Sequence, residues 1–335
     1  MGHRKQSAPR HGSLAFLPRA RSSRLVARIR YWPIEGHGEP KVLGFAGYKV
    51  GMTHASVFDN RDFSNTRGKE IQVPVTVLET PPLKVVAVRV YTATPNGIKS
   101  LAEIWVDKIP EQISRRISTL KTAKFVNKVD YLKKIRDKIA DVRLVVCTQP
   151  WLSGFGKKTP EVFELALSGD LDKRVDFAIS LLGRDLPVSE VLKEGQYVDV
   201  FAVTKGKGWA STIKRFGVRI MSRKSNKTRR GIATMGAKSP NNVMYTVPRA
   251  GQLGFWQRIM RNLLVLKIGS NKDEVNVKGG FLRYGEVRSN YVLLMGSAPG
   301  PAKRLVKIRA SARMAEKLED KLRVNSISIE SKQGV

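Results

Sequence analysis

The chain has 335 residues, and its 61 Lys and Arg against 28 Asp and Glu give a formal net charge of +33. Because like charges oppose a compact state, a surplus of this size indicates a polyanionic partner, either nucleic acid or an anionic membrane surface. The sequence has no apolar run of about 18 residues and no apolar signal core near its N-terminus, so we expect no membrane partner. The single cysteine, Cys147, excludes an intrachain disulfide and suits a reducing cytosol, and the four histidines lack zinc-binding spacing.

Most of the positive charge lies in two stretches that contain no Asp or Glu. The first 34 residues hold eight basic residues and residues 200–272 hold sixteen, which together account for 24 of the 33 net charges. Residues 1–40 also contain Pro, Gly and Ser, which discourage regular structure. We expect a basic N-terminal extension that becomes ordered only against phosphates, with apolar anchors at Leu14 and Phe16; a solvated tail is the alternative.

Residues 41–81 are predicted to form the first part of a β structure, with strands around 42–48 and over 70–80, where apolar and polar residues alternate. Residues 82–192 instead mix helical and strand patterns and are nearly balanced in charge, with nineteen basic and thirteen acidic residues. Their expected elements are strands at 85–90, 144–147 and 162–167 and helices at 109–120, 130–140 and 170–182. The pattern predicts an α/β unit inserted into a split barrel.

Residues 193–309 are predicted to complete the β structure and to carry a basic central finger, residues 209–262. Strands are expected at 197–204, 243–247, 262–268, 275–277, 292–295 and 305–308. Residues 222–242 show neither the hydrophobic period of a strand nor that of a helix. A basic loop of that length is uncommon in a compact domain unless it binds a ligand. Residues 310–335 form the tail, in which a helix is expected over 310–322.

Short strands with Gly and Pro turns indicate a mainly β barrel or sandwich.

Two features of the second acid-free stretch fit contacts with nucleic acid. Glycines alternate with Lys205 and Lys207, which lets the backbone approach a phosphate closely, although the stretch lacks the Gly-Lys-Ser/Thr ending of a nucleotide-binding loop. Trp256 beside Arg258 can stack on a base, and packing of Trp256 on its own domain is the alternative.

Five sequence motifs occur in one order along almost the whole chain. They read RHGSLAF at 10–16, GFAGYKVGMTH at 44–54, VTKGKG at 203–208, VPRAGQLG at 247–254 and PGPAKRLV at 299–306. In this combination the chain resembles the family of large-subunit ribosomal protein three in its archaeal and eukaryotic form. The resemblance implies a six-stranded β-barrel of the translation-protein type, split by an inserted α/β domain and carrying long basic extensions.

The resemblance also implies a function and a set of partners. Members of the family are structural constituents of the large ribosomal subunit that bind large-subunit ribosomal RNA, support early subunit assembly and extend a basic finger toward the peptidyl transferase centre. We therefore expect a cytoplasmic ribosomal protein that is not an enzyme and has no cofactor, no small-molecule substrate and no homo-oligomer. Neighbouring large-subunit ribosomal proteins are the other expected partners.

The residues expected to bind RNA are basic or aromatic and lie mostly in the acid-free stretches. They are Arg4, Lys5, Arg10, Arg19, Arg21, Lys205, Lys207, Trp209, Lys214, Arg215, Arg219, Arg223, Lys224, Lys227, Arg229, Arg230, Lys238, Arg249, Trp256, Arg258, Lys303 and Arg304. Lys238 stands where relatives place a tryptophan at the finger tip, so a phosphate contact is expected there in place of stacking.

Three other classes of protein are alternatives. An RNA-modifying enzyme needs a general base, but residues 200–272 contain no Asp, Glu, His or Cys. A translation factor needs a nucleotide-binding loop, and none is present. A free basic chaperone or chromatin-like protein is separated from a ribosomal protein by its sedimentation.

Overall fold

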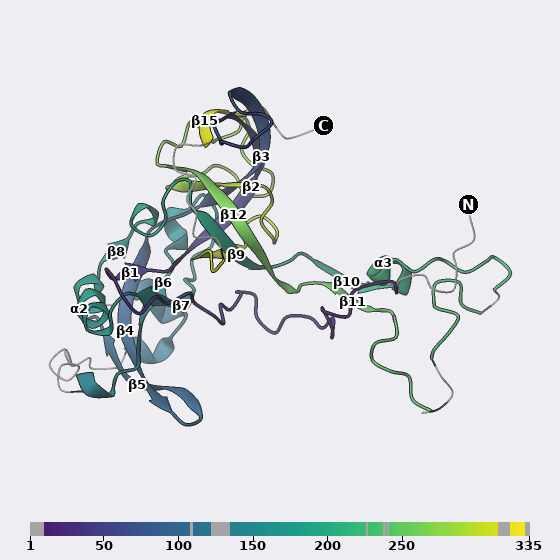
Figure 1. Ribbon diagram of the computed structural model, residues 1–335, viewed down its shortest axis with the longest axis horizontal. Coiled ribbons are helices and arrows are strands. Elements are labelled where there is room, and N and C mark those ends of the chain that lie inside the picture. Colours follow the sequence, from purple (N-terminus) through teal and green to yellow (C-terminus); the bar gives the residue numbers. More distant parts are fainter. Residues whose placement is uncertain are drawn as a thin grey trace. The chain divides into compact units, whose positions relative to one another are not determined.

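The computed structural model describes residues 10–107, 110–121, 135–225, 227–236, 239, 241–313 and 322–331 (Figure 1). The described chain is mainly β, as expected. It divides into two compact units. Unit 1 takes its described residues from 1–25 and 203–258, and unit 2 takes its own from 26–202 and 259–335. The two acid-free stretches thus contribute most of one unit, while the nearly balanced parts of the chain form the other.

Unit 2 contains a seven-stranded antiparallel sheet in the order β14-β9-β12-β13-β3-β2-β15. Its strands are β2 (Gly44–Asp59), β3 (Lys69–Glu79), β9 (Tyr197–Val203), β12 (Gln257–Gly269), β13 (Tyr291–Met295), β14 (Leu305–Ala310) and β15 (Leu322–Ile327). Strand β14 also pairs with β2, so it is bonded to β9 on one side and to β2 on the other. A register shift in β2 between Lys49 and Gly51 accompanies the change of partners.

Alternation along these strands sends side chains into two hydrophobic clusters. On β13, Val292 and Leu294 pack in one cluster, and Tyr291 and Leu293 pack in the other. The first cluster continues into the second sheet of unit 2, where it includes Leu144 of β6 (Asp141–Cys147). The period of two that predicted the strands therefore also fixes which residues share a core.

The strand expected at 275–277 is wrong. Val275 and Val277 are buried in the second cluster, but their backbone turns, with the amides of Val275 and Asn276 both donating to the carbonyl oxygen of Lys272. Apolar side chains here fill the core from a loop, and the pattern of apolar residues does not distinguish that arrangement from a short strand.

A second sheet in unit 2 has the order β1-β7-β6-β4-β5, with β8 beside β4. Its strands are β1 (Lys41–Val42), β4 (Leu83–Thr94), β5 (Gly97–Trp105), β6 (Asp141–Cys147), β7 (Val162–Ser168) and β8 (Asp185–Leu186). The expected helix over 170–182 is confirmed as α2 (Leu171–Leu181), which packs against β6 and β4. Cys147 is fully buried, and burial raises the pKa of its thiol to about 12.

Short 3-10 helices connect these strands. They are η1 (Glu111–Arg115), η2 (Ser118–Lys121), η3 (Arg136–Lys138), η4 (Pro150–Leu152) and η5 (Val188–Glu190). The α-helix expected over 109–120 is wrong, because the described residues form η1 and η2, and only Ile113 of η1 is buried.

Two further expected helices fall largely on residues that the structure does not describe. The helix over 130–140 lies partly outside the described residues, and residues 135–140 contain only η3. The helix over 310–322 lies mostly outside them as well. Leu322–Ile327 forms strand β15 on β2, so a tail that is helical throughout is wrong.

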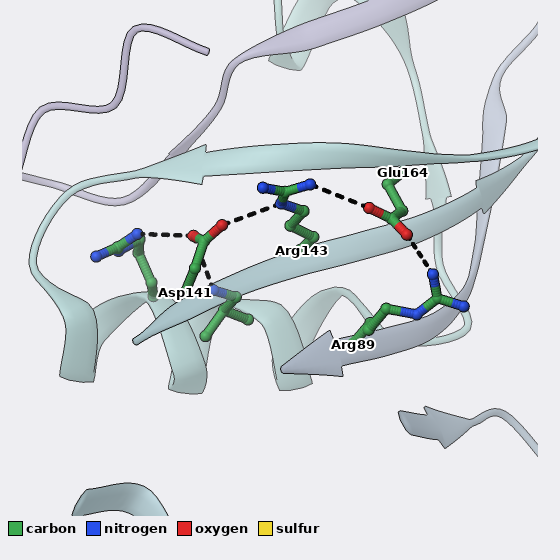
Figure 2. Close-up of polar contacts among 6 residues, drawn as sticks. Arg89, Asp141, Arg143 and Glu164 are labelled. Atoms are coloured by element: carbon green, nitrogen blue, oxygen red, sulfur yellow. Dashed lines mark hydrogen bonds and ion pairs between the residues drawn. The ribbon is translucent and has the colours of Figure 1, made fainter. Parts of the chain in front are cut away.

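A network of ion pairs, with Asp141 and Arg174 buried, ties the second sheet together (Figure 2). Arg143 lies between Asp141, 3.0 Å from its Nε, and Glu164, 3.2 Å from its Nη1, and Glu164 also pairs with Arg89. Arg174 of α2 reaches Asp141 at 3.4 Å. The network joins β4, β6, β7 and α2, and every charge in it has an opposite charge beside it.

Candidate nucleic-acid interface

Unit 1 is built around a short two-stranded ribbon and one helical turn (Figure 1). Strands β10 (Gly206–Ala210) and β11 (Gly251–Gly254) pair antiparallel, with Trp209 opposite Gln252. Helix α3 (Thr212–Phe216) follows β10 and ends at Gly217, which has the left-handed conformation. The described residues between 217 and 250 form no strand or helix.

The strand expected at 243–247 is wrong. The side chains of Val243, Met244 and Tyr245 are exposed, and the backbone forms a turn in which Val247 donates to the carbonyl oxygen of Met244 at 3.1 Å. Without a neighbouring strand or a core to cover it, a run of residues with high strand propensity has nothing to pair with.

Two glycines allow the segments of unit 1 to approach one another closely. Gly254 has a φ of +71°, and a Cβ there would overlap the carbonyl oxygen of Lys205. Gly12 has a φ of +81°, and a Cβ there would lie 2.6 Å from the ring of Phe216. The N-terminal segment and the helical turn after β10 therefore pack through a glycine.

Arg19 and Arg215 join the N-terminal segment to the base of the finger. Arg215 donates to three carbonyl oxygens, those of Gln252 at 2.9 Å, Arg249 at 2.9 Å and Arg19 at 3.0 Å. Arg19 donates in return to the carbonyl oxygen of Arg215. The Arg215 guanidinium thus holds three backbone carbonyls from separate parts of unit 1, so Arg215 is used as a structural side chain.

Guanidinium groups also lie over three aromatic rings of unit 1. Arg19 lies 4.0 Å from the centre of the Phe216 ring, and Arg258 lies 4.9 Å from the centres of both the Phe16 and Trp256 rings. Trp256 is half-buried, and its backbone amide donates to the Thr204 hydroxyl at 3.1 Å. Trp256 thus packs within its own unit, and its stacking on a base stays a prediction.

The charge of unit 1 has no internal compensation. Its two segments contain 19 Lys and Arg and no Asp or Glu. Burial lowers the pKa of the Arg19 guanidinium, and the nearby charges of Arg215, Arg258 and Arg10 lower it further. Arginine still keeps its proton at neutral pH, so the mutual repulsion is present in the free protein. An anion bound among these groups would relieve it.

The structure separates the expected RNA-binding residues into four groups, of which the last, Lys303 and Arg304, belongs to unit 2. Those with exposed side chains in unit 1 are Arg10, Arg21, Lys205, Lys207, Trp209, Lys214, Arg219, Arg223, Lys224, Lys227, Arg229, Arg230 and Arg249. Those half-buried in unit 1 are Arg19, Arg215, Trp256 and Arg258. Arg4, Lys5 and Lys238 lie outside the described residues.

Lys303 and Arg304 belong to unit 2. Lys303 is exposed in a turn with a φ of +67°, and its amide donates to the carbonyl oxygen of Lys49 at 2.8 Å. Burial lowers the pKa of Arg304. A role for these two residues in binding RNA stays a prediction.

Phe16 and Phe216 also belong to the candidate interface, although the sequence did not predict them as RNA-binding residues. Phe16 was expected only as an apolar anchor, yet Arg258 covers its ring. The signal that could have found both is the presence of aromatic residues within acid-free, arginine-rich segments, where a guanidinium is the available partner.

The described part of the chain shows neither a candidate metal site nor a membrane-spanning helix. None of its His, Cys, Asp and Glu residues form a group of three or more that could hold a metal ion. Its helices include none that is long and apolar enough to span a bilayer. An acid-free cationic unit with aromatic rings among its arginines is typical of proteins that bind a polyanion, in particular RNA.

Comparison with known proteins identifies the family. The family model for Ribosomal protein L3 matches residues 1–334. A relative from Picrophilus torridus is 46% identical over 332 residues, covering 97% of this chain and 98% of its own length. Relatives from Archaeoglobus fulgidus, 45% identical with 98% and 99% coverage, and Pyrobaculum neutrophilum, 46% identical with 93% and 94% coverage, are similar. All three are named large ribosomal subunit protein uL3.

The chain therefore belongs to the ribosomal protein L3 family. This is a family of structural ribosomal proteins and not of enzymes, which sets aside an RNA-modifying enzyme.

Proposed function

We propose that this chain is a structural component of the large subunit of the cytoplasmic ribosome and that unit 1 binds large-subunit ribosomal RNA. The observation that carries the proposal is the set of 19 cations without a single carboxylate in unit 1, most of them exposed. Phosphates would neutralise these charges, and the counterions released from the RNA would provide much of the binding free energy. The name shared by the relatives supports the same assignment.

The finger, residues 209–262, extends in this proposal toward the peptidyl transferase centre and helps early assembly of the subunit. Its support is the stretch from 217 to 250, whose described residues have neither strand nor helix and whose side chains are largely exposed. A segment of that length inside a folded protein is uncommon unless it serves a partner. Lys238, near the tip, would contact a phosphate.

The domain division proposed is a basic extension at 1–40, barrel parts at 41–81 and 193–309, an inserted α/β domain at 82–192 and a tail at 310–335. The pairing of β14 with both β9 and β2 supports a closed six-stranded barrel, because it joins the two ends of a β14-β9-β12-β13-β3-β2 series. The second sheet supports the insertion, since all its strands except β1 come from 82–192.

Binding of the full-length chain to large-subunit ribosomal RNA, measured at several salt concentrations, tests this function. If about ten phosphates are neutralised, the logarithm of the affinity should fall with the logarithm of the salt concentration with a slope of about −7 to −9. In cell extracts the chain should sediment with the large subunit at moderate salt. A slope near −1, or recovery only in the light fractions, would contradict the proposal.

A further inference from the structure

The loop between β2 and β3, residues 60–68, is fixed by one buried carboxylate. Asp59 accepts hydrogen bonds from the backbone amide of Arg61 at 3.1 Å and from its Nε and Nη2 at 2.9 Å each. It also accepts from the hydroxyls of Ser64 and Thr66, both at 2.6 Å. The backbone of the loop adds further bonds, including one from the amide of Gly68 to the carbonyl oxygen of Asp59 at 2.7 Å. The loop is therefore held in one conformation.

This fixed loop presents a fully exposed aromatic side chain. Phe63 has the highest exposure among the large hydrophobic side chains of the described residues, above Trp209 at 81%. Single exposed apolar residues are normal on protein surfaces, so the exposure of Phe63 is informative only together with the fixed loop that carries it. A phenylalanine held outward by a fixed loop is pre-organised for a partner, because little conformational entropy is left to lose when it binds.

The charges of the loop argue against RNA as that partner. Arg61 pairs with Asp59 at 2.9 Å, and Arg67 lies 3.7 Å from Asp62. The segment from 59 to 68 thus has two cations and two anions, and each cation has an anion beside it. RNA-binding surfaces need cations that are free to neutralise phosphates, as in unit 1. A neutral rim around a protruding aromatic side chain is instead the arrangement of a protein–protein anchor.

We propose that the loop at 60–68 docks a neighbouring protein of the subunit, with Phe63 inserted into an apolar pocket on that protein. The proposal rests on the assignment of the chain to the large subunit and adds a specific surface and the chemistry of its partner. The partner needs a pocket of apolar or aromatic side chains with little net charge around it. Asp59 acts as the positioning residue, because it fixes the loop without being exposed itself.

Site-specific crosslinking tests this docking surface in assembled subunits. The full-length chain carries the photoreactive residue benzoylphenylalanine at position 63, and purified large subunits are irradiated. A crosslink to one protein, resistant to ribonuclease and removed by protease, is the expected result. A crosslink to RNA would overturn the proposal in favour of base stacking, and the absence of any crosslink would show that Phe63 remains in solvent.

A pair of substitutions in the same loop gives an independent readout. With Phe63→Ala, the crosslinked protein should dissociate from subunits at about half the salt concentration needed for the unsubstituted chain. Asn65→Ala, which changes another exposed side chain of the loop, should leave that concentration unchanged. Equal behaviour of the two variants would overturn the proposal. The chain with Phe63→Ala should still sediment with the subunit through unit 1, so its failure to do so would instead concern the proposed function.

Discussion

Adjacent cations in unit 1 have different roles. Lys214 is exposed, whereas Arg215 is half-buried and donates to three backbone carbonyls. Arg215→Ala should therefore destabilise unit 1 by about 2–3 kcal/mol, because three carbonyls lose a charged donor. Faster hydrogen exchange at the amide of Phe255, which bonds to Lys205, would report this loss.

Lys214→Ala is the matched control. It should leave hydrogen exchange unchanged and reduce the slope of log affinity against log salt by about 1, as expected for one lost phosphate contact. If both variants changed only the slope, Arg215 would be an RNA contact and not a structural side chain.

The buried carboxylate of Asp59 predicts a dependence of stability on pH. Hydrogen bonds from Arg61, Ser64 and Thr66 hold the pKa of this carboxyl well below its usual range. A group whose pKa is lowered on folding stabilises the protein above its unfolded pKa, about 3.9 for Asp, and loses that contribution as the pH falls. Asp59→Asn should cost about 1–3 kcal/mol at pH 6. In urea unfolding, the difference between variant and parent should shrink toward pH 3, and a constant difference would contradict the assignment.

At the scale of elements, the ribbon β10–β11 depends on a glycine at its end. In Gly254→Ala the added methyl group would overlap the carbonyl oxygen of Lys205, so the ribbon must shift and lose pairing. Gly208→Ala is the control, since its φ of +62° is also positive but the space around it is open. We expect a loss of about 1 kcal/mol for Gly208→Ala and a clearly larger one for Gly254→Ala. Hydrogen exchange at the ribbon amides measures both, and equal losses would mean that only the φ matters.

The sequence predicts the strands of unit 2 well and the structure of unit 1 poorly. Apolar–polar alternation marks β3, whose Val73, Val75 and Val77 pack in one cluster, and a short continuous apolar run marks β13, which packs in both clusters. The same signal fails at 243–247 and at 275–277, where apolar residues lie on an exposed turn and in a buried loop. Composition was enough to propose the candidate residues of unit 1. It did not predict that Arg215 binds backbone carbonyls, because a guanidinium–carbonyl bond leaves no sequence pattern.

At the scale of the whole molecule, the two acid-free stretches form one unit and not two independent arms. The N-terminal segment was expected to order only against phosphates, yet its described residues already bond to the base of the finger, as in the pair Arg19 and Arg215. Sequence separation hides this contact, since nothing in either stretch alone identifies the other as its partner.

Limited proteolysis of the free, full-length chain distinguishes these arrangements. Cleavage should begin between 218 and 248, where the described residues have no regular structure and exposed side chains. Residues 10–25 should be cut more slowly, because they pack on the base of the finger. Cleavage of both regions at the same rate would mean that the N-terminal segment is ordered only by RNA.

The bond between Arg19 and Arg215 has a consequence for synthesis of the chain on the ribosome. Its partners are 196 residues apart in the sequence. At about 5–20 residues per second, the N-terminal segment is made roughly 10–40 s before the residues on which it packs. During that interval the nascent chain carries the cations of its first 25 residues without the carbonyl and aromatic partners of the finger base. Translation speed across the intervening residues therefore sets how long this segment is open to other anions.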